Sequence, residues 1–103
     1  MLAASYRAER KPEGYAQVAV STTAVALPSI PSKASYAIVN VNAQPLRYRD
    51  DGTVPTATVG MPLAAGDEIA LVSPAQIRAF RAIRSGGTDA EINVSYYSAD
   101  KAI

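Results

Sequence analysis

The residues best placed to do chemistry are four charged side chains in one short segment, Arg47, Arg49, Asp50 and Asp51. Two adjacent carboxylates before Gly52 slightly resemble the start of a calcium-binding loop. A complete loop needs further carboxylates at fixed spacing and a bidentate glutamate, whereas valine, proline, threonine and alanine follow here. We therefore interpret Asp51-Gly52 as a turn, because glycine reaches positive φ without steric cost.

The two arginines alternate with Leu46 and Tyr48, which is the period of a half-buried strand. Both guanidinium groups would then lie on one face, where they could bind carboxylates of a partner in bidentate fashion. The same pattern also fits a solvated strand face. We expect partner-binding residues on this strand, on the loop after it and at an outward-facing tyrosine of the last strand. They are Arg47, Arg49, Asp50, Asp51, Pro55, Thr56 and Tyr97.

This chain lacks most of the residue types that catalytic and metal-binding sites commonly use. It contains no cysteine and no histidine, which removes thiolate chemistry, the commonest general base and the commonest transition-metal ligand. A serine–lysine pair is formally possible, but none of Lys11, Lys33 and Lys101 lies in a glycine-framed motif. The acidic residues fall in predicted turns rather than in a cleft. We expect no enzyme activity, no catalytic residues, no metal and no cofactor.

The composition favours a structural or binding protein over a nucleic-acid or membrane protein. The chain has 103 residues, enough for one domain, with a net charge of +1 and only 18% charged residues. Arg78, Arg81 and Arg84 are too few for a nucleic-acid site without interleaved aromatic residues. No apolar run approaches a membrane span, and the first residues are not typical of a secretory signal. We expect folding in the cytoplasm and a surface partly covered in an assembly.

The elements around the charged segment are predicted to be short strands. Alternation predicts strands at residues 16–21, 24–27, 35–42, 46–49, 68–72 and 91–97, and an extended loop or edge strand at 54–61. The count of seven or eight short strands favours an all-β fold, an antiparallel β-sandwich that is jelly-roll-like, or a small barrel.

Residues 73–84 are ambiguous between a helix and a strand. Ser73, Pro74 and Gln76 are typical of a helix start, and Ile77 and Phe80 could continue one helical stripe. The segment also precedes Gly-Gly-Thr-Asp and a clear strand, which is typical of a hairpin. We predict one short helical turn at 74–78 and a strand at 79–84.

The domain organisation is predicted to have three parts. Residues 1–15 are polar and broken by Pro12 and Gly14, so they are interpreted as an extended N-terminal arm. The arm is either disordered or ordered against a neighbouring subunit. Residues 16–97 would form the β-sandwich domain and residues 98–103 a short tail.

Two segments together resemble a family of small virion proteins of tailed bacteriophages. They are RYRDDGTVPTATVGMPLAAGD at residues 47–67 and FRAIRSGGTDAEINVSYY at residues 80–97. The resemblance spans about residues 16–97. It implies a small β-sandwich structural subunit of the virion, of the capsid cement or decoration type. The implied partners are the major capsid protein or other virion proteins and further copies of the chain, often as a trimer.

A second function class remains open from the residues. A carbohydrate- or receptor-binding β module of a phage neck or tail would use the tyrosines and residues 50–58 as a sugar platform. The absence of tryptophan speaks weakly against this alternative.

Overall fold

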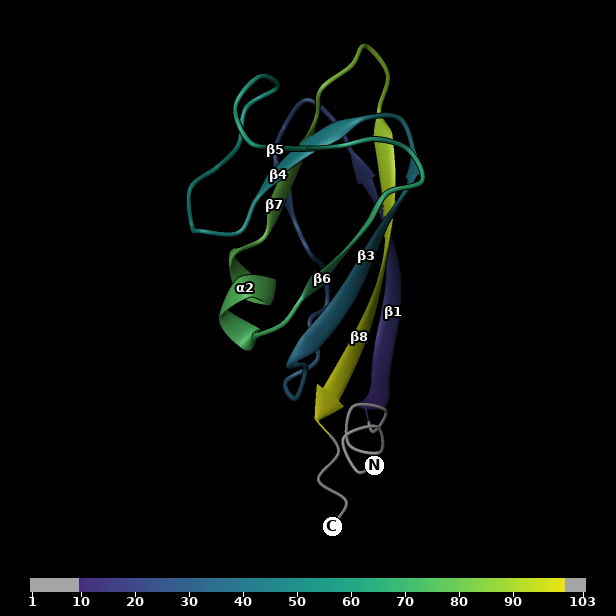
Figure 1. Cartoon of the computed structure of the whole chain (residues 1–103), viewed down its shortest axis with the longest axis vertical. Helices are drawn as coiled ribbons and strands as arrows, with labels where there is room; N and C mark the ends of the chain where they lie inside the picture. The colour runs from purple at the N-terminus through teal and green to yellow at the C-terminus, as the bar shows by residue number, and fades with distance from the viewer. Residues whose placement is uncertain (1–9, 100–103) are drawn as a thin grey trace, which may run out of the picture.

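The computed structural model describes residues 10–99, which form eight strands and one short helix. The strands build two four-stranded antiparallel sheets in the orders β1-β8-β3-β6 and β2-β7-β4-β5 (Figure 1). The elements are β1 Arg10–Val20, β2 Val25–Ala26, β3 Tyr36–Ala43, β4 Leu46–Arg49, β5 Met61–Leu63, β6 Glu68–Leu71, α2 Pro74–Ala79, β7 Arg81–Arg84 and β8 Ala90–Ala99. The predicted all-β sandwich is confirmed.

The first sheet has β8 and β3 at its centre. Ile92, Val94 and Tyr96 of β8 alternate with outward residues and are fully buried, as the alternation predicts. Val39 and Val41 of β3 are buried on the same side. The Tyr96 hydroxyl donates to Pro28 O at 2.7 Å, which holds the β2–β3 connection against the sheet. Burial raises the pKa of Tyr96 to about 12, so the hydroxyl stays a donor well into the alkaline range.

The second sheet buries the opposite half of the core. Leu46 of β4 is fully buried, and the ring of Tyr48 stacks on Phe80 with ring centroids 5.4 Å apart. The alternation of β4 therefore directs Arg47 and Arg49 to the outer face of this sheet, as predicted. Strand β4 lies between β7 and β5, so the charged segment begins on a strand paired on both sides. This pairing fixes where the following loop starts and ends.

Helix α2 resolves the ambiguity of residues 73–84. Ser73 is the N-cap and its Oγ accepts from Gln76 N at 3.2 Å, with Pro74 in the first turn. The helix ends at Ala79, and Phe80 has an extended φ of −61° and ψ of 133° that leads into β7. The predicted helical turn followed by a strand is confirmed, and the strand begins at Arg81 rather than at residue 79.

The predicted boundary between arm and domain lies too late in the sequence. Strand β1 begins at Arg10, and it pairs with β8 from Arg10 opposite Ala99 to Val20 opposite Ala90. Glu13 Oε2 accepts a hydrogen bond from Ser98 Oγ at 2.6 Å within this extension. Residues 10–15 and 98–99 thus belong to the sheet, because pairing with β8 replaces the apolar pattern that they lack. The rest of the predicted arm and tail, 1–9 and 100–103, lies outside the described residues.

Candidate interaction surface

The loop between β4 and β5, residues 50–60, carries most of the predicted partner-binding residues. Its base is closed by Arg47, whose Nη1 donates to Gly60 O at 2.8 Å and whose Nε donates to Ala57 O at 3.2 Å. Pro55 is fully buried beneath the loop. Gly60 has a φ of +148°, and a Cβ there would lie 3.1–3.2 Å from Tyr48 O, Arg47 Cβ and Pro55 Cβ. The loop therefore packs closely on its own strand.

The tip of the loop is a tight turn organised by Thr56. The backbone of Thr56 exchanges hydrogen bonds with Val59, at 2.9 and 3.3 Å. Thr56 Oγ1 accepts from Thr58 N at 3.3 Å and from Val59 N at 3.0 Å. These bonds fix the segment locally, because a threonine hydroxyl can satisfy turn donors that would otherwise bind water.

The start of the loop is held by an ion pair. Arg49 donates in bidentate fashion to Asp51, from Nε at 3.1 Å and from Nη2 at 2.5 Å. Asp51 Oδ1 also accepts from Thr53 N at 3.2 Å. These hydrogen bonds, from Arg49 first, lower the pKa of Asp51 to about 2. Gly52 has a φ of +89°, which confirms the predicted turn.

Asp50 joins the loop to helix α2. Its Oδ2 accepts from Gln76 Nε2 at 2.8 Å, and Gln76 Oε1 accepts from Val72 N at 2.9 Å. One glutamine side chain thus connects the loop, the end of β6 and the helix start. Asp50 and Asp51 are both occupied by protein donors, which fits the turn interpretation. Among residues 10–99, no group of three or more acidic side chains is arranged to hold a metal ion.

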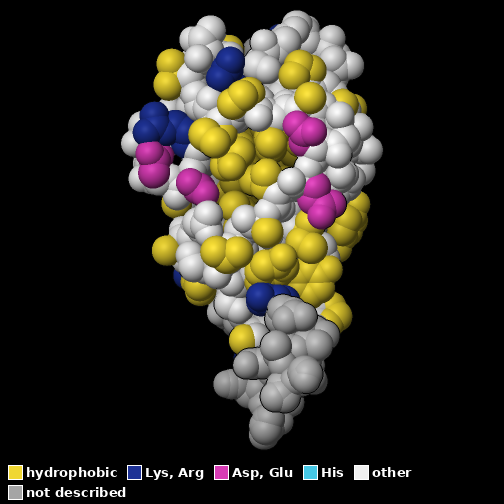
Figure 2. Space-filling model, viewed as in Figure 1, with side chains coloured by type: hydrophobic (Ala, Val, Ile, Leu, Met, Phe, Trp, Pro, Cys, Tyr) yellow, Lys and Arg dark blue, Asp and Glu magenta, His cyan; other side chains and the backbone are white. Residues whose placement is uncertain are grey.

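The loop presents large apolar side chains to solvent. Val54 is 59% exposed, Val59 53% and Met61, the first residue of β5, 59%. Figure 2 shows hydrophobic side chains across the middle of the molecular face that carries β5 and β6, with acidic side chains on both sides. We call Val54, Val59 and Met61 the apolar loop residues. The sequence prediction did not include these three residues. The only sequence signal for them was that residues 54–61 are rich in β-branched side chains.

The seven predicted partner-binding residues do not form one surface. Arg47, Arg49 and Asp51 use their charges within the chain, and Pro55 is buried. Thr56 is exposed at the loop tip. Tyr97 lies on the outer face of the other sheet, where its ring packs edge-on against Tyr36 with ring centroids 6.0 Å apart and Arg10 covers Tyr36. The predicted site is therefore a braced loop on one sheet, with Tyr97 apart from it.

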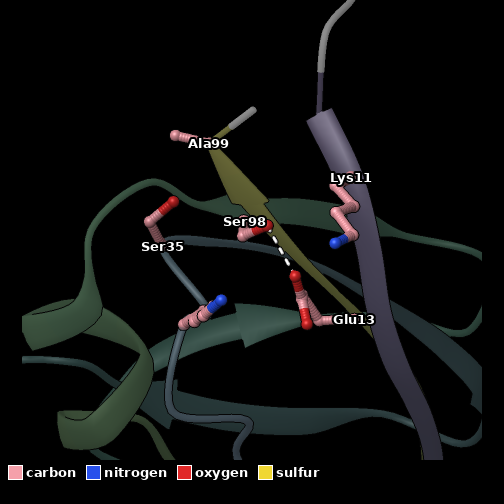
Figure 3. Close-up of a pocket in the computed structure, with 6 residues that line it drawn as sticks. Lys11, Glu13, Ser35, Ser98 and Ala99 are labelled. Carbon is pink, nitrogen blue, oxygen red and sulfur yellow. Dashed lines mark hydrogen bonds between the residues drawn. The ribbon is translucent and has the colours of Figure 1, made fainter. Parts of the chain in front are cut away.

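A separate depression lies beside the ends of β1 and β8. It is lined by Lys11, Glu13, Lys33, Ser35 and Ser98 (Figure 3). The Glu13 carboxylate accepts a hydrogen bond from the buried Ser98 hydroxyl, so one of its oxygens already links β1 to β8. The two lysines offset the charge of the single carboxylate, and the serine hydroxyl that bonds to this carboxylate is buried.

Comparisons with known proteins add no family assignment. No protein-family model, no curated protein and no solved structure matches this chain. Within residues 10–99 there is also no helix of the length and hydropathy that a membrane span requires.

Proposed function

We propose that the chain is a non-enzymatic structural protein of a virion, a cement or decoration subunit that stabilises a capsid by protein–protein contacts. The observation that carries the proposal is the β4–β5 loop, which exposes Val54, Val59 and Met61 while its backbone is held by Arg47 and Thr56. A loop fixed before binding loses little entropy on a partner, so its apolar area contributes more fully to affinity. The resemblance of residues 47–67 and 80–97 to phage virion proteins gives the partner class, the major capsid protein or another virion protein.

The mechanism would be burial of the apolar loop residues in a groove between neighbouring shell proteins. Arg49 beside the loop is paired with Asp51, whereas Arg47 donates to loop carbonyls and Asp50 accepts from Gln76. These charged groups have hydrogen-bond partners before binding, and a charge buried without a partner would oppose binding more strongly. Each subunit would contribute a small stabilisation of the shell, and the contributions of many copies on one shell would sum. Localisation would follow from this, with synthesis in a host cytoplasm and residence in the particle.

The sugar-binding alternative is less well supported by the geometry. Its platform needs tyrosine rings beside residues 50–58, whereas Tyr36 and Tyr97 lie on the other sheet and Tyr96 is buried. Tyr48 is on the correct sheet but stacks on Phe80 inside the sandwich.

The test is binding of purified protein to capsids that lack it. A triple variant Val54→Ser, Val59→Ser and Met61→Ser should bind at least about ten-fold more weakly, since loss of the few central contacts that dominate an interface costs about 2 kcal/mol or more. Val72→Ser is the matched control, because Val72 is 64% exposed but lies outside the loop, between β6 and α2. Equal binding by the triple variant and the wild type would contradict the proposal.

A further inference from the structure

Strand β1 has an unusually long open edge. It lies at the margin of its sheet with β8 on one side, and no strand among residues 10–99 pairs with its other side (Figure 1). Its second half, residues 15–20, reads YAQVAV and contains no charge, no proline and no glycine. Such an edge presents unpaired backbone donors and acceptors and is a template for another strand.

The other sheet edges of the described chain are protected by comparison. Strand β2 has only two residues, β5 is a three-residue strand with Pro62 in its middle, and β6 has four residues beginning with the charged Glu68. Short length, proline and charge are the usual means of blocking edge pairing. The first half of β1 is blocked in the same way by Pro12 and by the bulge between Pro12 and Gly14. Among the described sheet edges, residues 15–20 of β1 are therefore the segment most open to pairing with another strand.

We propose that residues 15–19 of β1 pair antiparallel with the same residues of a second copy of this chain, across a two-fold axis at Gln17. Residues directly opposite in an antiparallel pair lie on the same face. An axis at Gln17 places Tyr15 opposite Ala19 of the second copy, and Ala16 opposite Val18 of the second copy. In each pair, both residues lie on the same face of their sheets. The outer face of one copy therefore continues into the outer face of the other, and the inner faces are continuous in the same way.

The side chains on the outer face suit a self-complementary contact. Tyr15 is 65% exposed, and pairing would lay each ring over the small Ala19 of the other copy. Gln17 Nε2 donates to Asn93 Oδ1 at 3.1 Å, and an amide with two donor hydrogens and one acceptor oxygen can also bind its own symmetry mate. Arg10, Lys11 and Glu13 would face the uncharged chain after Val20, so no like charges oppose one another. These features favour a second copy over a charged or bulky partner strand.

The inference deepens the proposed function, on which it rests for its biological use, by naming one partner in the assembly. Five residues of edge from each copy make a small interface, so we expect a dimer that dissociates on dilution. The experiment uses purified full-length chain without any capsid protein. Failure of the dimer therefore leaves the capsid-binding test untouched, and failure of capsid binding leaves the dimer untouched.

The test is sedimentation equilibrium over a concentration series. The wild type should be a dimer, and Gln17→Lys and Gln17→Glu should each be monomeric, because each places like charges opposite one another at the axis. An equimolar mixture of the two variants should form dimers again. Ala70→Lys is the control, since Ala70 is exposed on the same outer face but on β6 at the far edge. Thermal melts by circular dichroism should show that all variants are folded.

Four results would each overturn the proposal. They are a wild type that stays monomeric at the highest soluble concentration, a trimer, a dimer that survives Gln17→Lys, and a mixture of the two Gln17 variants that stays monomeric. Dissociation by Ala70→Lys to the same extent would also overturn it, because the effect would then come from added charge in general.

Discussion

Arg47 and Gly60 are joined across the base of the β4–β5 loop, with Nη1 of the arginine donating to the glycine carbonyl at 2.8 Å. The two residues are thirteen positions apart in the sequence. From the sequence, Arg47 was expected to bind a partner. In the structure it instead holds the backbone of the loop in place. Its charge supports the loop backbone, and the apolar loop residues are left to make the external contact.

Replacing Arg47 should loosen the loop. We expect Arg47→Ala to lower the free energy of unfolding by about 1–2 kcal/mol, since two charge-assisted bonds to carbonyl groups are lost from a half-buried position. Amide hydrogen exchange at Val59 should rise. Arg47→Lys is the control, because it keeps the charge without the planar fork and should retain part of the protection. Unchanged exchange in Arg47→Ala would show that the Thr56 turn holds the loop alone.

The two glycines of the loop should respond differently to alanine. Gly60→Ala combines positive φ with three atoms at 3.1–3.2 Å from the new Cβ, and should cost about 2–3 kcal/mol of unfolding free energy. Gly52→Ala has positive φ but nothing within 4 Å, so only the backbone term of about 1–2 kcal/mol remains. Denaturant unfolding of both variants measures the difference. Equal losses would mean that the close packing around Gly60 relaxes freely.

The Arg49–Asp51 ion pair predicts a pH effect at the low end. The pKa of Asp51 is lowered to about 2 in the folded chain, against about 3.9 in an unfolded one. The stabilisation is therefore complete above about pH 4 and is lost as the pH falls toward 2. An NMR titration of the Asp51 carboxyl should show the low midpoint, and Arg49→Ala should move it up toward the ordinary value. A normal midpoint in the wild type would show that the pair does not persist in solution.

The centre of β8 should not tolerate charge on its inner side. Val94 is fully buried, so Val94→Asp should prevent folding, because an unpaired buried carboxylate costs several kcal/mol out of a total of about 5–15 kcal/mol. Ser95→Asp, one residue later on the outer face, is the matched control and should fold. Circular dichroism melting compares the two variants. Cooperative melting of Val94→Asp would contradict the assigned core.

Most of the secondary structure could be predicted from local patterns in the sequence. The alternation of Ile92, Val94 and Tyr96 predicted the face of β8, and Ser73 with Pro74 predicted the start of α2, because each signal lies within a few residues.

Long-range contacts could not be predicted in the same way. Strand β1 extends back to Arg10 because of pairing with β8, and the residues of that extension have no apolar pattern of their own. The brace from Arg47 to Gly60 depends on where the loop returns, and Tyr97 is separated from the loop by the choice of sheet. These features follow from the arrangement of strands, which alternation alone does not determine.

Locating the chain in purified particles tests the central claim most directly. The measurement is a density map of the virus particle in which the proposal places the chain, with copy number from quantitative mass spectrometry. The account predicts many copies on the capsid, with residues 50–60 against a shell protein and Val54, Val59 and Met61 buried in that contact. Absence of the chain from the particle, or a bound subunit whose loop faces solvent, would contradict it.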